Sequence, residues 1–196
     1  MKRTFDLFFA CLGILVCTPL LLGIAVFLKL DSRGTLLYRG LRVGKGGRQF
    51  HILKFRTMVV NAEAIGGPST SDDDPRVTRL GKLLRRWKLD ELPQLANIIR
   101  GEMSFVGPRP EVPLEVARYD ERQRRLLEVL PGITDYASIR FRNEGEILKG
   151  AADPHQAYRE RIQPEKIRLG LEYVDNRSLA TDVKIIFMTV RAVLCG

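Results

Sequence analysis

Two neighbouring carboxylates, Asp90 and Glu91, are the residues in this sequence whose types and spacing most suggest chemistry. They stand in the stretch WKLDELPQL, just before a proline, which a helix tolerates only in its first turn. Basic residues precede them, and Arg109 follows between Pro108 and Pro110. A nucleophilic carboxylate, a metal-binding carboxylate and cations for a phosphate are therefore close together in the chain. The same residues also fit an ordinary helix start, with Asp90 as N-cap and Glu91 as a first-turn acid.

The overall composition indicates an anionic partner. The 196 residues suffice for one domain with a core, and 32 Lys and Arg against 23 Asp and Glu give a net charge of +9. Nucleic acid, anionic lipid headgroups and phosphorylated small molecules all fit such a charge. Nucleic acid is disfavoured, because the basic residues are not interleaved with an aromatic platform.

Cysteine and histidine usage excludes two classes of site. Cys11 and Cys17 lie in an apolar run and Cys195 lies near the C-terminus, which suggests a reducing compartment and no disulfide framework. His51 and His155 have no second ligand at zinc spacing. A structural zinc site is therefore not expected.

Residues 7–28 form an uncharged apolar run of about the length that a bilayer-spanning helix needs. A signal peptide is disfavoured, because no small-residue cleavage site precedes Lys29. Thr18 and Pro19 lie near the middle of the run, where Pro19 removes a helical hydrogen bond. The sequence thus favours a re-entrant helix–break–helix over a proline-kinked spanning helix, which stays open.

Charges at the two ends of this run support the re-entrant form. The flanking cations are Lys2 and Arg3 before the run, and Lys29, Arg33, Arg39 and Arg42 after it. Because cytoplasmic flanks are enriched in Lys and Arg, both ends are expected on the cytoplasmic side. Asp6 is costly in lipid, and we expect it to pair with Lys2 or Arg3 or to lie at the interface.

The remaining sequence predicts an α+β fold that is mainly helical. We expect a small β-hairpin from strands at 35–38 and 50–55, a loop at 61–75, and amphipathic interfacial helices around the active site. The helices are expected at residues 77–87, 92–99 (stopped by Gly101), 113–130, 165–173 and 178–194. The last helix fits either the headgroup layer or the core. Residues 1–30 would form the membrane hairpin and residues 31–196 the catalytic domain.

Several motifs occur in a characteristic order along nearly the whole chain. They are Lys2-Arg3 with Asp6, Thr18-Pro19, KLDS (29–32), KFRTM (54–58), LDELPQL (89–95), GEMSFVGPRP (101–110), PGIT (131–134) and Ser178 with Asp182-Val183-Lys184. On these motifs the chain resembles the small monotopic phosphoglycosyl transferases, a family of bacterial sugar transferases. The family's membrane element is a re-entrant helix–break–helix, in agreement with the reading of residues 7–28.

This resemblance implies an enzyme that transfers a sugar 1-phosphate from a UDP-sugar to undecaprenyl phosphate and releases UMP. It would be monotopic on the cytoplasmic face of the bacterial inner membrane, in contact with one leaflet, and would begin assembly of an O-antigen, capsule, exopolysaccharide or glycoprotein glycan. By the same resemblance Asp90 is the nucleophile that forms a phosphosugar–aspartyl intermediate and contacts Mg²⁺. Glu91 is its catalytic partner.

The resemblance also implies a set of substrate-binding residues. They are Lys54, Arg56 and Arg85 around the phosphates, Pro108, Arg109 and Pro110 at the nucleotide, and Arg142 at a further basic position. From the residues alone, a solvated strand face is the favoured interpretation of Lys54 and Arg56.

Two departures from the family pattern leave the sugar open. Residues 135–141 read DYASIRF, where the family usually continues with glycine and an AQVNG-like segment. Gly170 stands where many members carry an aspartate, seven positions before Arg177. The alternatives are a membrane-associated glycosyltransferase that releases UDP and a non-catalytic basic membrane adaptor. The oligomeric state is also open, a homodimer included.

Overall fold

The structure is a computed structural model that describes residues 1–31, 34–67 and 69–195. Ser32 of the expected KLDS motif and Arg33 of the expected basic flank lie outside the described residues.

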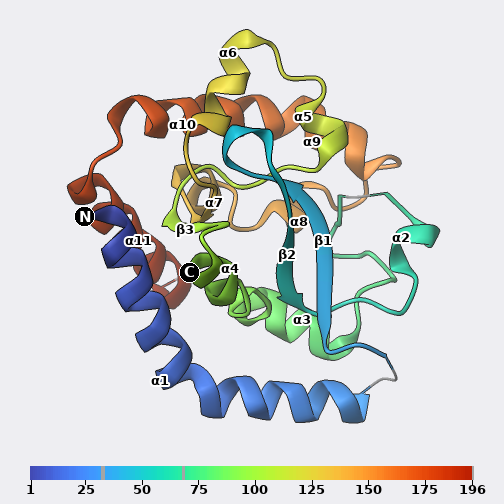
Figure 1. The fold of residues 1–196 in the computed structure, drawn as a ribbon. Helices are drawn as coiled ribbons and strands as arrows, with labels where there is room; N and C mark the ends of the chain where they lie inside the picture. Colours follow the sequence, from blue (N-terminus) through green and yellow to red (C-terminus); the bar gives the residue numbers. More distant parts are fainter. Residues whose placement is uncertain (32–33, 68, 196) are drawn as a thin grey trace.

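The N-terminal apolar run forms one long helix, α1 (Lys2–Asp31), which changes direction sharply near its middle (Figure 1). Pro19 lies inside the helix and has no N–H for the helical ladder, and the Thr18 hydroxyl donates to the Ile14 carbonyl at 2.7 Å. These two residues account for the bend. Among the described residues, α1 is the helix that is long and apolar enough to cross a membrane.

Both halves of α1 pack against the rest of the protein along one side. In the first half, Ala10 is fully buried against Ile98 and Phe50. In the second half, Leu28 is buried against Phe55 and Leu84. The other side of the helix is apolar and exposed: it carries Phe8, Phe9, Leu12, Leu15, Val16, Leu20, Leu22, Val26, Phe27 and Leu30.

Polar contacts hold both ends of α1 to the folded body. Lys2 forms an ion pair with Asp182, and Arg3 donates to the backbone carbonyls of Ile98 and Ile99, the latter at 2.8 Å. At the far end, Arg56 Nη2 donates to the Leu28 carbonyl at 3.5 Å.

The expected pairing of Asp6 with Lys2 or Arg3 is wrong. Asp6 is buried, and its Oδ1 accepts a hydrogen bond from the Phe105 N–H at 3.3 Å, while Lys2 is paired with Asp182. The carboxylate thus lies inside the protein rather than at the edge of the apolar run.

The predicted β-hairpin is confirmed, although its strands are longer than expected. Strands β1 (Leu37–Val43) and β2 (Gln49–Phe55) are antiparallel, joined by the short 3-10 helix η1 (Lys45–Gly47). Figure 1 shows this hairpin in the middle of the molecule, between α1 and α4 on one side and the helices α5, α9 and α10 on the other.

A second sheet was not predicted. Strand β3 (Ser104–Val106) pairs in parallel with β4 (Gly132–Thr134). The two backbones run unusually close, since a Cβ on Gly132 would lie 2.2 Å from the Gly107 nitrogen. Glycine is therefore required at both Gly132 and Gly107. Gly107 is the residue that begins the Gly107-Pro108-Arg109-Pro110 segment.

The structure is mainly helical, as expected, but with different boundaries. The remaining elements are α2 (Ala62–Ile65), α3 (Arg79–Arg86), η2 (Leu89–Glu91), α4 (Gln94–Arg100), α5 (Pro113–Val116), α6 (Glu121–Arg124), η3 (Arg125–Glu128), α7 (Tyr136–Arg140), α8 (Glu144–Ile147), α9 (Pro154–Arg161), α10 (Gln163–Asn176) and α11 (Leu179–Cys195).

Two outcomes concern helix ends. The end of α4 at Gly101 is confirmed, because Gly101 adopts a left-handed conformation with φ 80°. The single helix expected over 113–130 is wrong: Pro113 begins α5, and Asp120 caps the separate α6 through a capping box with Gln123. A loop therefore interrupts the charged stretch.

Candidate active site

Asp90 and Glu91 lie in η2, the single turn that links α3 to α4, and both are buried. Pro93 stands immediately before α4, as expected for a proline at a helix start. The N-cap reading of Asp90 is wrong, because Pro93 occupies that position and the Asp90 side chain caps no helix. The two acids are thus buried for a reason other than helix capping.

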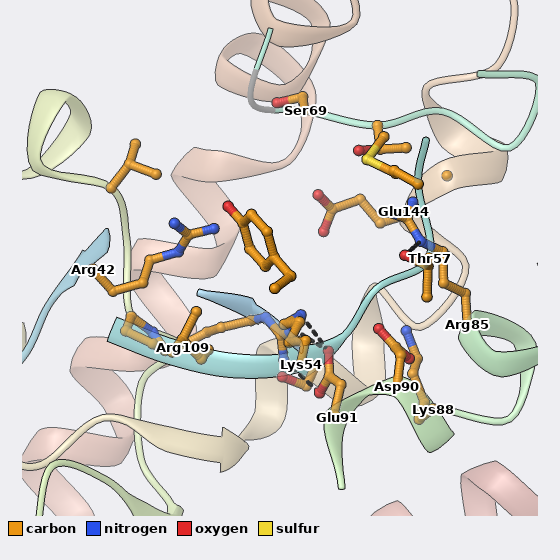
Figure 2. A pocket seen from close by; sticks show the side chains of 18 of the residues that line it. Arg42, Lys54, Thr57, Ser69, Arg85, Lys88, Asp90, Glu91, Arg109 and Glu144 are labelled. Carbon is orange, nitrogen blue, oxygen red and sulfur yellow. Dashed lines mark hydrogen bonds and ion pairs between the residues drawn. The ribbon is translucent and has the colours of Figure 1, made fainter. Parts of the chain in front are cut away.

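Glu91 is bound by two cations that come from distant parts of the chain. Lys54 Nζ donates to Glu91 Oε1 at 2.8 Å, and the Arg109 guanidinium binds both carboxylate oxygens, with Nη1 at 3.2 Å from Oε2 (Figure 2). Arg109 Nη1 also donates to the Ile133 carbonyl at 3.4 Å, which ties it to β4. Burial acts to raise the pKa of Glu91, but the charges of Arg109 and Lys54 outweigh it and hold that pKa well below the ordinary value.

The pKa of Asp90 is shifted in the opposite direction, above its ordinary value. Burial is the largest cause; the charge of Lys54 opposes the shift, and the charge on Glu91 adds to it. Its buried Oδ1 has no hydrogen-bond partner within the described parts of the chain. A buried carboxylate oxygen without a protein partner costs free energy, so Asp90 Oδ1 is available to a water, a ligand or a reacting atom.

Further cations surround Asp90. Arg85 lies beside it in Figure 2, and its Nε donates to the Thr57 hydroxyl at 2.9 Å. Lys88, which precedes Asp90 by two residues, is drawn next to the same carboxylate. The sequence analysis counted Lys88 only among the basic residues that precede the acid pair and assigned it no role in substrate binding.

The structure brings together five of the expected site residues, namely Lys54, Arg85, Asp90, Glu91 and Arg109. Arg56 and Arg142 line the same cleft, but their guanidinium groups donate hydrogen bonds to backbone carbonyls. Arg56 donates to Leu28, and Arg142 donates to Ala192 and Val193 at the end of α11. Their roles in substrate binding stay predictions.

Comparison with known proteins settles the family. A family model described as bacterial sugar transferase matches residues 1–196. The chain belongs to the bacterial sugar transferase family.

Relatives carry informative names. The chain is 39% identical, over its whole length and 44% of the relative's, to a UDP-N-acetylgalactosamine-undecaprenyl-phosphate N-acetylgalactosaminephosphotransferase of Aeromonas hydrophila. It is 40% identical to an undecaprenyl-phosphate glucose phosphotransferase of Komagataeibacter xylinus, covering 97% of this chain and 35% of that one. It is 38% identical to the exopolysaccharide production protein ExoY of Sinorhizobium fredii, covering 98% of this chain and 84% of ExoY. The chain thus spans less than half of the first two relatives.

In this member of the family the acid pair opens into a large cleft of about 2110 Å³. Its walls come from β1, β2, residues 57–62 and 69–72, α7, α8 and the Pro108-Arg109-Pro110 segment. Glu144 of α8 projects into it from the side opposite η2 (Figure 2). The cleft is large enough for a nucleotide-sized ligand.

Both departures from the family pattern shape the wall near Arg109. Asp135 caps α7 through the Ser138 N–H at 2.6 Å, and burial raises the pKa of its carboxyl. A Cβ on Gly170 would meet Leu126 at 2.7 Å and Pro108 at 3.5 Å, so α10 lies closely on the residue before Arg109.

Proposed function

We propose that this protein transfers a sugar 1-phosphate from a UDP-sugar to undecaprenyl phosphate and releases UMP. The observation that carries the proposal is the buried, unpartnered Asp90 Oδ1, set beside a Glu91 whose two oxygens are already bound by Lys54 and Arg109. Relatives named as undecaprenyl-phosphate sugar phosphotransferases support the same reaction class.

In the first step, an Asp90 carboxylate oxygen attacks the phosphorus that carries the sugar. A new oxygen–phosphorus bond forms, the bond to the UMP phosphate breaks, and UMP leaves with that electron pair. Arg109 and Lys54, held in place by Glu91, offset the charge of the diphosphate as it approaches the acids. The product of this step is a phosphosugar on Asp90.

In the second step, a phosphate oxygen of undecaprenyl phosphate attacks the same phosphorus. The bond to Asp90 breaks, the carboxylate is regenerated, and the sugar diphosphate of the lipid leaves. Two anionic substrates are never together at the reacting phosphorus in this scheme, since each half of the reaction uses one of them. Ping-pong kinetics are the expected signature.

The residues fit a Mg²⁺ ion. Among the described residues there is no cluster of three or more His, Cys, Asp or Glu side chains that could hold a metal by themselves. Mg²⁺ is commonly held by one or two carboxylates together with substrate phosphates and water, and Asp90 has a free buried oxygen for that purpose. When bound, Mg²⁺ would neutralise charge on the diphosphate and polarise the phosphorus under attack.

We further propose a monotopic placement, in one leaflet at the cytoplasmic face of the inner membrane. Lys2 at one end of α1 and Leu28 near the other are both held by the same folded body. A helix that crossed the membrane would have its ends on opposite sides, whereas a bent helix with one exposed apolar side fits a single leaflet. Apolar side chains are also exposed on two other helices, namely Val183 and Phe187 of α11 and Leu83 of α3.

The test is to supply the purified protein with undecaprenyl phosphate, Mg²⁺ and a panel of UDP-sugars, and to identify the nucleotide released. UMP is expected, and Asp90→Asn should lower its formation by at least about 10³-fold while thermal unfolding stays near wild type. Mass spectrometry of the protein with donor alone should find the added sugar phosphate on the peptide containing Asp90.

Other outcomes identify the rival functions. Release of UDP would indicate a glycosyltransferase that moves the sugar without its phosphate. No nucleotide from any donor, together with binding to anionic vesicles, would favour the non-catalytic adaptor. Retained UMP release in Asp90→Asn would remove Asp90 as the nucleophile.

A further inference from the structure

Lys88 has an unusual backbone conformation. With φ 55° and ψ 20° it lies in the left-handed region, and Asn61 is the other described residue besides glycine with positive φ. Lysine has no side-chain means to favour this region, so the conformation costs free energy. Such residues cluster at functional sites, where the surrounding structure maintains them.

Hydrogen bonds of the turn explain how the conformation is maintained. The Lys88 N–H donates to the Arg85 carbonyl at 3.1 Å, and the Lys88 carbonyl accepts from the Glu91 N–H at 3.2 Å. The turn that buries the acid pair therefore also directs Lys88. Its side chain lines the cleft, and Figure 2 shows its amine beside the Asp90 carboxylate.

The cations around the acids are not equivalent. Lys54 and Arg109 are both bound to Glu91, and Arg85 is bound to Thr57. Within the described residues, the Lys88 amine forms no hydrogen bond or ion pair, and the residue is exposed to the cleft. A ligand in the cleft would therefore reach the Lys88 charge without displacing a protein partner.

Lys88 also lies on the side of the site that faces the apolar helix. The next residue, Leu89, packs against the cluster that contains Ile24 and Leu28 of α1, and Leu84 of α3 is buried in the same cluster. Trp87, the preceding residue, is 46% exposed. By contrast, Lys54 comes from the hairpin and Arg109 is tied to β4.

We propose that Lys88 binds the phosphate of the polyprenyl phosphate acceptor, while Lys54 and Arg109 serve the donor side with Glu91. The inference rests on the function proposed above. A lipid-linked phosphate enters from the apolar side of the cleft, and a compact ammonium group next to Asp90 would hold it for attack on the phosphorus. In that step the acceptor oxygen–phosphorus bond forms, the Asp90–phosphorus bond breaks, and Lys88 offsets the charge of the attacking phosphate.

The experiment separates the two halves of the reaction. We would measure kcat/KM for undecaprenyl phosphate and, separately, the rate of UMP release from the UDP-sugar without acceptor. Lys88→Met should lower kcat/KM for undecaprenyl phosphate about ten- to hundred-fold, as expected for loss of a charged hydrogen bond. This loss should be at least about tenfold larger than the loss in the rate of UMP release without acceptor. Lys88→Arg should restore most of the acceptor kcat/KM.

Two variants control for charge and backbone. Lys45→Met removes an exposed lysine in the hairpin turn, outside the cleft lining, and should leave both measurements unchanged. Lys88→Asn removes the charge but tolerates the left-handed conformation, so it should behave like Lys88→Met.

The outcomes discriminate between this inference and the proposed function. No UMP from the wild-type protein with any donor would overturn both. UMP release by the wild-type protein would leave the function standing. If Lys88→Met then lowered the acceptor kcat/KM and the rate of UMP release equally, or lowered only the rate of UMP release, the role of Lys88 would be overturned. Recovery of the acceptor kcat/KM in Lys88→Asn, or a Tm that is lowered in Lys88→Met but not in Lys88→Asn, would show that the backbone conformation and not the amine is required.

Discussion

At the residue scale, two adjacent acids differ because their neighbours differ. Glu91 has both oxygens occupied by cations, so it is held ionised and acts as the anchor for Lys54 and Arg109. Asp90 is equally buried but keeps an oxygen without a partner. The chain therefore separates the group that organises the site from the group that is available to react.

Arg109 gives a test of this division. Arg109→Ala removes the two-pronged contact to Glu91, and we expect it to lower kcat/KM for the UDP-sugar about 100-fold, because charge-assisted bidentate contacts are strong and geometrically specific. Arg109→Lys, which keeps the charge but not the fork, should fall in between. Steady-state kinetics with the donor varied would measure this. An unchanged dependence on donor concentration would refute a donor-side role.

Sequence reasoning pointed to Asp90, Glu91 and Arg109, which the structure brings together, but not to the contacts that hold them. The types and order of Asp90, Glu91 and Arg109 carry the resemblance, whereas the contact of Lys54 with Glu91 depends on how the hairpin packs against η2. Arg56 and Arg142 are the same type of residue as Arg109. Nothing near them in sequence indicates that their guanidinium groups contact carbonyls of α1 and α11.

At the element scale, local patterns predicted the elements that have strong local signals. The β-hairpin has β-type strands around a glycine-rich turn, and α4 ends at a glycine with positive φ. The β3–β4 sheet was missed because strands of three residues are too short to show alternation. The break near Asp120 was missed because a charged helical pattern continued across it.

The close approach of β3 and β4 predicts a sensitive glycine. Gly132→Ala would place a methyl group about where the Gly107 backbone lies, and the strands would have to separate. We expect a loss of about 1–3 kcal/mol in the free energy of unfolding, as in overpacked cores, together with lower activity, because Arg109 follows Gly107. Thermal unfolding would measure the first. For comparison, Gly46→Ala should not clash, since nothing lies within 4 Å, although its positive φ carries a smaller strain cost.

Glu115 joins α5 to α9 and α10, and it predicts a pH dependence of stability. Burial acts to raise the pKa of Glu115, but hydrogen bonds from Arg159 at 2.6 Å and Gln163 at 2.8 Å outweigh it, so the pKa lies below the ordinary 4.5. A lowered carboxyl pKa contributes stability that is present above pH 4.5 and is lost as the pH falls through the lower, folded-state value. Glu115→Gln should therefore destabilise the protein at pH 7 by about 1–3 kcal/mol.

The check is Tm as a function of pH for wild type and Glu115→Gln. The difference between the two should be present at pH 7 and should shrink as the pH falls below 4.5. A difference that grows on acidification would contradict the assignment of the stabilising contact to the ionised carboxylate.

At the scale of the whole molecule, α1 and the body share two cores. Ala10 contributes to the cluster around Ile98, and Leu28 contributes to the cluster around Phe55 and Leu84. The sequence indicated the apolar run and predicted a break at Thr18-Pro19, where the structure has a bend within one helix. It gave no sign that one side of the run would be buried in protein, because nearly every position in it is apolar.

The placement of α1 predicts that both of its ends are on one side of the membrane. Single cysteines at Thr4 and Asp31, both exposed, in a background without the native cysteines, should react with a membrane-impermeant maleimide only after spheroplasts are lysed. A reference cysteine in a known periplasmic protein should react before lysis. Reaction of either end of α1 in intact spheroplasts would indicate a spanning helix.

The shared cores of α1 have a practical consequence for making this protein in quantity. Deleting the first 30 residues, a usual route to a water-soluble fragment, would leave the pockets that Ala10 and Leu28 now fill open to solvent. It would also remove the partner that Asp182 has in Lys2. The truncated protein should therefore aggregate, and surfactant or nanodisc preparations of residues 1–196 are the form in which this protein will stay folded.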